Sequence, residues 1–109
     1  MKIQYIDNVC LKLGENAQEN WDLISKAKQE YYWVHLQSFP SGHIIVESME
    51  PSEQILQEAG LFCLKHTKFK NLKNIFIIYT KVSNLVLTHN IGEVEFKSNR
   101  KTQKLLLPS

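Results

Sequence analysis

The sequence has no long apolar run, few glycines and only two cysteines. No apolar run in the 109-residue sequence approaches the roughly 20 residues that a membrane helix needs, so we expect no membrane association. No apolar run follows Lys2, so we also expect no signal peptide, and a cytoplasmic protein. Cys10 and Cys63 have no CxxC spacing, which favours two buried thiols and leaves a disulfide open.

The four glycines form neither GxGxxG nor GxxxxGK[ST], which argues against a loop that cradles a nucleotide. The serines lie outside any GxSxG context, and Cys63 falls on the apolar face of an expected helix. These absences predict that the chain is not an enzyme and holds no cofactor.

Charge is unevenly distributed along the chain. Residues 1–60 carry four lysines and nine acidic residues, a net charge of −5, whereas residues 61–109 carry nine Lys and Arg and two acidic residues, a net charge of +7. Clustered basic side chains attract phosphates and release their counterions. The pattern indicates an anionic partner, although a solvated lysine-rich face is the simpler interpretation of charge alone.

The hydrophobic periodicity predicts one α+β domain over residues 1–109, a mixed β-sheet with two main helices packed on one of its faces. Expected strands are residues 2–6, 9–13, 31–36, 43–47, 75–79, 85–88, 92–96 and 103–107, and expected helices are residues 16–28 and 53–67. Asn16 and Ser52 are expected N-caps. The continuous apolar run at 75–79 indicates a strand that is buried on both faces.

Two histidines fall on adjacent expected strands. His35 and His43 would be neighbours across a hairpin, with Ser41 and Gly42 in the turn between them. Three interpretations stay open: structural hydrogen bonding, a pocket for a phosphate or a base, and zinc binding or hydrolysis. No third ligand follows at a recognisable spacing, so we expect no metal site.

Basic residues gather after the second expected helix. Lys65, Lys68, Lys70 and Lys73 follow one another closely, Lys81 follows the apolar strand, and Arg100, Lys101 and Lys104 lie near the last turn. Aromatic residues interleave with them, and exposed aromatics beside basic groups can stack unpaired bases. We expect Lys65 to Lys81 to gather into one electropositive surface.

Several segments taken in order resemble the NFACT-R family, the RNA-binding domain of ribosome-quality-control proteins. Gly14 to Leu23 is similar to that family's G-x-N-x-x-x-N-D/E-x-L opening, Trp33-Val34-His35 to its D-I-W-x-H, and Pro40 to Val46 to its P-G-S-H-V-V-I. Tyr79 to Leu85 and Gly92 to Val94 are similar to its late strand, basic loop and Gly-x-V strand. The chain departs from the family at Val86-Leu87, where a basic pair is common.

The resemblance implies a stand-alone nucleic-acid-binding domain whose partner is RNA, either tRNA or rRNA, in ribosome quality control, with the ribosome itself a further partner. DNA binding and the docking of an acidic protein partner are the alternatives. The nucleic-acid-binding residues that the resemblance and the basic set together imply are Asn20, Trp33, His35, Ser41, His43, Lys65, Lys68, Lys70, Lys73, Lys81 and Asn84.

Overall fold

A computed structural model describes residues 1–108, which form an α+β domain, as expected. The strands are β1 (Lys2–Ile6), β2 (Val9–Leu13), β3 (Tyr32–Leu36), β4 (Ile44–Val46), β5 (Phe76–Lys81), β6 (Leu85–Leu87), β7 (Val94–Phe96) and β8 (Gln103–Leu106). The helices are α1 (Ala17–Lys26) and α2 (Glu53–Lys65), with short 3-10 turns η1 (Val82–Asn84) and η2 (Asn99–Lys101). No helix among the described residues is long and apolar enough to cross a membrane.

Both α-helices begin where the sequence places their caps. The Asn16 side chain accepts a hydrogen bond from the Glu19 N–H at 2.9 Å, and the Ser52 hydroxyl accepts one from the Ile55 N–H at 3.2 Å. Each cap satisfies one of the free N–H groups of a first helical turn. The two N-cap predictions are therefore confirmed.

The strands form two sheets rather than one. A six-stranded sheet has the order β1-β2-β4-β3-β5-β8, and β6 pairs with β7 alone. Each pairing among the described residues is antiparallel, so the expected mixed sheet is corrected to an antiparallel one. Short connections such as the Asp7-Asn8 turn and the β3–β4 loop join antiparallel neighbours without a crossover helix.

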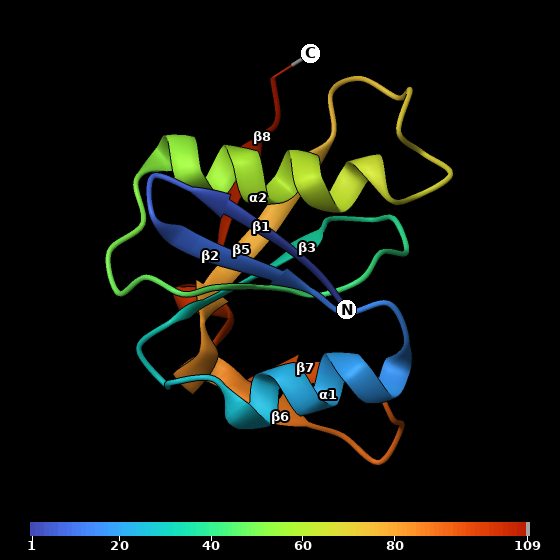
Figure 1. Ribbon diagram of the computed structural model, residues 1–109. Helices are drawn as coiled ribbons and strands as arrows, with labels where there is room; N and C mark the ends of the chain where they lie inside the picture. The colour runs from blue at the N-terminus through green and yellow to red at the C-terminus, as the bar shows by residue number, and fades with distance from the viewer. Residues whose placement is uncertain (109) are drawn as a thin grey trace.

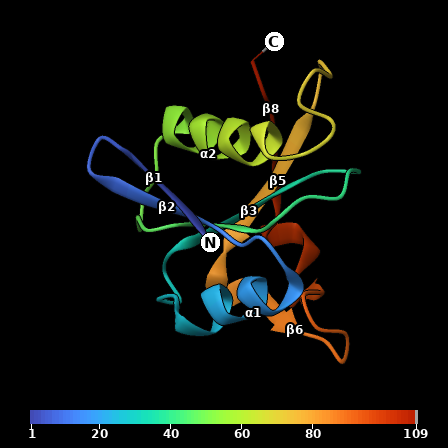
Figure 2. The same cartoon turned by 45° about the vertical axis from the view of Figure 1, so that its right-hand side comes forward.

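The helices cover opposite faces of the large sheet, so their expected placement on one face is wrong. Figure 1 shows α2 on one side of the sheet and α1 on the other, with β6 and β7 beside α1, and Figure 2 agrees. Val34 and Ile44 pack toward α2, whereas their neighbours Trp33 and Ile45 pack toward Ile24 of α1. Strands that are apolar on both faces need cover on both.

Strand β5 is less enclosed than its apolar sequence predicts. Ile77 is fully buried on the α2 face, but Ile78 is half-buried and Phe76 is 43% exposed. The expectation of burial on both faces is therefore wrong, because α1 and the small sheet cover only part of the second face. The end of β5 that begins at Phe76 is therefore open to solvent on this face.

The packing of α2 on the sheet depends on the absence of a side chain at Gly60, so a substitution there tests the fold. A Cβ at this position would lie 2.5 Å from Leu107 Cδ2 and 2.7 Å from Ile77 Cγ2. We expect Gly60→Ala to lower the free energy of unfolding by about 1 kcal/mol, because overpacking of about 2 kcal/mol exceeds the gain in helix propensity. Urea unfolding measures this, and Gln54→Ala on the exposed side of α2 should change stability by less than about 0.5 kcal/mol. A more stable Gly60→Ala variant would contradict the packing.

Candidate nucleic-acid interface

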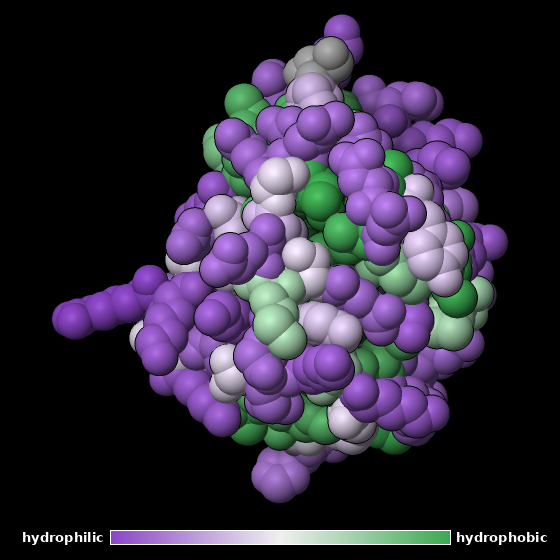
Figure 3. Space-filling view, turned by 60° about the vertical axis from the view of Figure 1, so that its left-hand side comes forward, coloured by the Kyte–Doolittle hydropathy of each residue, from purple (hydrophilic) through white to green (hydrophobic). Residues whose placement is uncertain are grey.

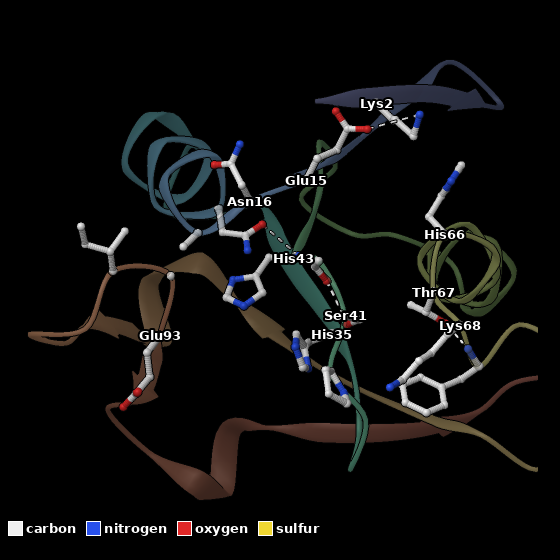
Figure 4. A pocket seen from close by; sticks show the side chains of 18 residues that line it. Lys2, Glu15, Asn16, His35, Ser41, His43, His66, Thr67, Lys68 and Glu93 are labelled. Atoms are coloured by element: carbon white, nitrogen blue, oxygen red, sulfur yellow. Dashed lines mark hydrogen bonds and ion pairs between the residues drawn. The ribbon is translucent and has the colours of Figure 1, made fainter.

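A hollow of about 830 Å³ opens beside the loop that joins β3 to β4. The hairpin contributes His35, Ser41 and His43, and the other walls come from the N-terminal end of α1, the segment after α2 and residues 91–93. Figure 4 shows the two histidines and Ser41 at its centre, with Lys68 and Glu93 on opposite sides. We call this site the hairpin hollow.

The floor of the hairpin hollow is fixed by a close approach of two chain segments. The Gly14 N–H donates to the His43 carbonyl at 3.0 Å, and the His43 N–H donates to Asn20 Oδ1 at 3.2 Å. A Cβ on Gly42 would collide with the Gly14 carbonyl oxygen, and a Cβ on Gly14 would collide with Asn20 Oδ1. Glycine is therefore required at both positions, and the buried Asn20 joins α1 to the hairpin.

The expectation that His35 and His43 are neighbours is confirmed. Their ring centroids lie 5.0 Å apart, edge to face. Trp33 stacks parallel to His35 at 5.7 Å and meets His43 edge to face at 5.3 Å. Trp33 itself is only 3% exposed and does not line the hairpin hollow, so it holds the imidazoles in place.

Burial disfavours the protonated form of both imidazoles. Desolvation lowers the pKa of His35, against the opposite effect of the Leu36 and Ser41 carbonyls. Desolvation, with a smaller contribution from His35, lowers the pKa of His43 to about 3. His35 Nδ1 lies 2.6 Å from the Leu36 carbonyl, which can only accept, so this nitrogen carries the proton of the neutral ring. The pair offers hydrogen bonds rather than positive charge.

Two buried nitrogen atoms of this site lack hydrogen-bond partners in the described part of the chain, which lowers the stability of the fold. Neither Trp33 Nε1 nor His43 Nδ1 has a hydrogen-bond partner among residues 1–108, although both atoms are buried. Each such group costs about 1–3 kcal/mol. Since both atoms belong to one aromatic cluster beneath the hollow, stability is lost at the point where the hairpin histidines are held.

Metal and thiol chemistry find little support in this geometry. Among residues 1–108, no group of three or more His, Cys, Asp and Glu side chains is placed to hold a metal ion. Cys10 and Cys63 are both free and buried, and burial raises the pKa of the Cys63 thiol to about 11. A protonated thiol is a poor nucleophile, so Cys63 acts as packing beside the Gly42 carbonyl.

Four exposed lysines lie at the end of α2 and in the connection that follows it. Lys65 ends α2, and Lys68, Lys70 and Lys73 lie in the connection to β5; we call these four the lysine segment. Lys68 also lines the hairpin hollow. Within residues 1–108 the only lysines in ion pairs are Lys2 and Lys12, so no lysine of the lysine segment is paired with a carboxylate there. Figure 3 brings the opposite side of the molecule forward, and on that face hydrophilic side chains predominate as well.

The expected single basic surface is divided in two. Lys81 lies at the far end of β5 from Lys73, and the five-residue rise from Phe76 to Lys81 is roughly 17 Å. Asn84 lies at the same end of β5 as Lys81. It is only 4% exposed, and its side-chain amide is hydrogen-bonded to Thr80 and Ser98. Of the predicted residues, the hairpin hollow gathers Asn20, His35, Ser41, His43 and Lys68.

Sequence reasoning did not place Lys2, His66 or Glu93 at the hairpin hollow. Lys2 and Glu93 reach it from distant parts of the chain, and His66 was expected within the helix over residues 53–67. His66 is instead exposed, because α2 ends at Lys65 and His66 is its C-cap. Lys65, just before it, was the available signal that the helix ends there.

The neutral state of His43 predicts how stability depends on pH. The unfolded imidazole takes up a proton near its ordinary pKa of 6.5 while the folded one does not, so stability falls as pH drops below that value. Between pH 7 and 5 we expect His43 to account for a loss of about 2 kcal/mol.

Urea unfolding of the unaltered protein and of His43→Asn at both pH values isolates that contribution. The His43 ring resonances in an NMR titration give the same information without a substitution, and we expect them to show no titration between pH 8 and 5. A midpoint near 6.5 would show that the imidazole is not desolvated.

Comparisons with known proteins support the fold. The solved structure of the C-terminal of the fibronectin/fibrinogen-binding protein from Streptococcus suis (FBPS) has a TM-score of 0.83 at 18% identity, over 96% of this chain and 43% of that chain. At that identity the likeness shows the fold alone. The Rqc2 homolog RqcH of Bacillus subtilis (strain 168) is 28% identical over 75 residues, 68% of this chain and 13% of its own length. The chain therefore spans less than half of each of these relatives.

The family comparison covers most of the chain. The sequence profile of the NFACT protein RNA binding domain matches residues 3–98, from β1 to just beyond β7. That range contains every wall of the hairpin hollow except Lys2, together with the whole lysine segment. The resemblance seen in the sequence is confirmed, and the chain belongs to the NFACT-R family of RNA-binding domains.

Proposed function

We propose that this chain binds RNA through the hairpin hollow and the lysine segment. The observation that carries the proposal is the adjacency of exposed lysines, free of carboxylate partners within residues 1–108, to a hollow with polar groups at its centre. Lys68 belongs to both, so a phosphate held by the lysines would bring its nucleotide to the histidines. The proposed role is binding rather than catalysis.

The chemistry on the two sides of the site differs. Lysines contact phosphates as point charges, which gives affinity without sequence information. His35 Nε2 can instead accept a hydrogen bond from a base edge or a ribose, because Nδ1 is engaged by the Leu36 carbonyl. The Ser41 hydroxyl beside it donates to the Gly42 carbonyl and accepts from the Leu36 N–H. On this basis we propose weak sequence preference and a partner with accessible, unpaired nucleotides.

The family suggests where such RNA is found. We propose tRNA or rRNA in ribosome-associated quality control, in the cytoplasm, as the likeness to RqcH and the NFACT-R family membership support. The chain matches 13% of RqcH, so any action of the rest of that protein is not carried over. Crosslinking in cells followed by sequencing of the attached nucleic acid tests this, and recovery of background RNA alone would remove the proposed partner.

The affinity for RNA should depend steeply on salt. If about five phosphates are neutralised, binding of a labelled single-stranded RNA should weaken about 10²-fold between 50 and 200 mM salt, because counterions are released from each phosphate. Fluorescence anisotropy at several salt concentrations measures this slope. A deoxy oligonucleotide of the same sequence tests the DNA alternative. Tighter binding of the deoxy oligonucleotide would favour DNA, and equal affinity would show that the site does not discriminate between the two. An affinity that does not change with salt would contradict the proposal that lysine–phosphate contacts bind the RNA.

The lysine segment should account for part of that slope. We expect Lys65→Ala combined with Lys68→Ala to reduce the slope of log affinity against log salt by about 1.4, since each single-strand phosphate contact contributes about 0.7. The matched control is Lys12→Ala with Lys26→Ala, which removes the same charge from a pocket that also contains Glu19, Asp22 and Glu47. If both double variants lower the slope equally, net charge rather than this site governs binding.

One observation favours the docking of an acidic protein partner as a second candidate function. Phe76 and Leu106 are cross-strand neighbours on β5 and β8, and both are more than two-fifths exposed just beyond the lysine segment. An apolar patch beside basic residues suits a protein interface. A pull-down that survives nuclease treatment would favour this candidate over RNA.

A further inference from the structure

A second pocket lies at the opposite end of β5 from the lysine segment. It has a volume of about 590 Å³ and opens between the end of β5, the η1 turn and the η2 turn before β8. Its basic side chains are Lys81, Lys97, Arg100 and Lys101, and we call it the basic pocket. We infer that the basic pocket binds a phosphate group, independently of the hairpin hollow.

The charge of the basic pocket is uncompensated within the described chain. No Asp or Glu is among the residues that line it, and none of its four basic side chains forms an ion pair within residues 1–108. Four like charges around one concavity repel one another and raise the local potential, which attracts an anion. Glu53 is near enough to affect the Tyr79 phenol, but it is not among the residues that line the pocket.

A buried hydrogen-bond network holds the turns that carry these side chains. The Asn84 amide donates to Thr80 Oγ1 at 3.1 Å and to the Ser98 carbonyl at 2.9 Å, and it accepts from the Ser98 N–H at 2.9 Å. Thr80 Oγ1 in turn donates to the Lys101 carbonyl at 3.0 Å. The backbone on both sides of Arg100 is thus fastened to β5, so ligand binding need not order it.

The donors present suit phosphate rather than a simple halide or a carboxylate alone. Arg100 offers a planar fork of N–H groups that can bond two oxygens at once, and lysines add point charges. The Ser83 and Ser98 hydroxyls line the same pocket and can donate to further oxygens. A tetrahedral anion with several acceptor oxygens would use more of these donors than a smaller ion.

Two tyrosines give the pocket an aromatic side. Tyr32 and Tyr79 line it with ring centroids 6.3 Å apart, and the Tyr79 hydroxyl donates to Gln103 at 2.7 Å. Burial is the main cause of the raised pKa of Tyr79, with smaller effects from Tyr32 and Glu53. A protonated phenol ring can pack against a sugar or a base beside the bound phosphate, so either an RNA phosphodiester or free phosphate fits this chemistry.

The test uses the whole chain and removes two charges that the fold does not use. Lys97 and Arg100 are exposed, and no side-chain hydrogen bond or ion pair within residues 1–108 involves either of them. We expect Lys97→Ala with Arg100→Ala to reduce the salt slope of RNA binding by about 1.4, as for two lost single-strand phosphate contacts. The control is again Lys12→Ala with Lys26→Ala, which should leave the slope unchanged.

A second measurement separates the two sources of phosphate. Inorganic phosphate is added to the isotope-labelled protein, and the backbone amide resonances of residues 97–101 are followed by NMR. Shifts there that disappear in the Lys97→Ala, Arg100→Ala variant, with no change in RNA binding, assign the pocket to free phosphate. A reduced RNA slope assigns it to an RNA phosphodiester. If phosphate causes no such shifts and the variant binds RNA with the original slope, the inference is overturned.

Failure of this inference is distinguishable from failure of the proposed function. If the Lys65→Ala, Lys68→Ala variant lowers RNA affinity while the Lys97→Ala, Arg100→Ala variant does not, and phosphate shifts no amide at residues 97–101, the hairpin hollow binds RNA and the basic pocket is inert. If no RNA binds the unaltered chain but phosphate shifts the amides of residues 97–101, the basic pocket stands without the proposed function.

Discussion

The contact of two glycine backbones, Gly14 and Gly42, is the constraint on which the site depends. The side chain of Asn20 fills the space beside Gly14 and accepts the His43 N–H, so α1, β2 and the β3–β4 hairpin meet within one small volume. Nothing larger than glycine fits at either position. This contact sets the orientation of the hairpin against α1, and through it the depth at which both imidazoles lie.

Local features of the fold could be predicted because their causes are local. The caps at Asn16 and Ser52 and the alternation in β1 each act within a few residues, and the helices begin there. The faces covered by the helices depend on contacts between distant segments. The pairs Trp33-Val34 and Ile44-Ile45 are nevertheless apolar on both faces of the sheet, which required cover on each side and was the missed signal.

The site divides in the same way between what is local and what is distant. The neighbouring imidazoles follow from a short hairpin, whose register places Val34 opposite Ile44 and leaves His35 and His43 facing across its end. The lysines were expected together because they are close in sequence. Lys81 is the last residue of β5, however, and Lys73 precedes that strand; an extended chain separates its residues by a larger rise than a helix does.

The two regions proposed to bind phosphate are related through a single strand. Tyr32 at one end of β3 lines the basic pocket, and His35 near the other end lines the hairpin hollow. The backbone rises roughly 10 Å between them, and the two side chains point to opposite faces of the sheet. A free phosphate gains nothing from that spacing, whereas a polymer with phosphates at regular intervals can occupy both regions at once. Because the second contact is then intramolecular, two weak sites would bind the polymer much more tightly than either alone. The sheet between the two regions is rigid, so the distance between them is fixed. A bound RNA strand would therefore have to run along the line that joins the two regions.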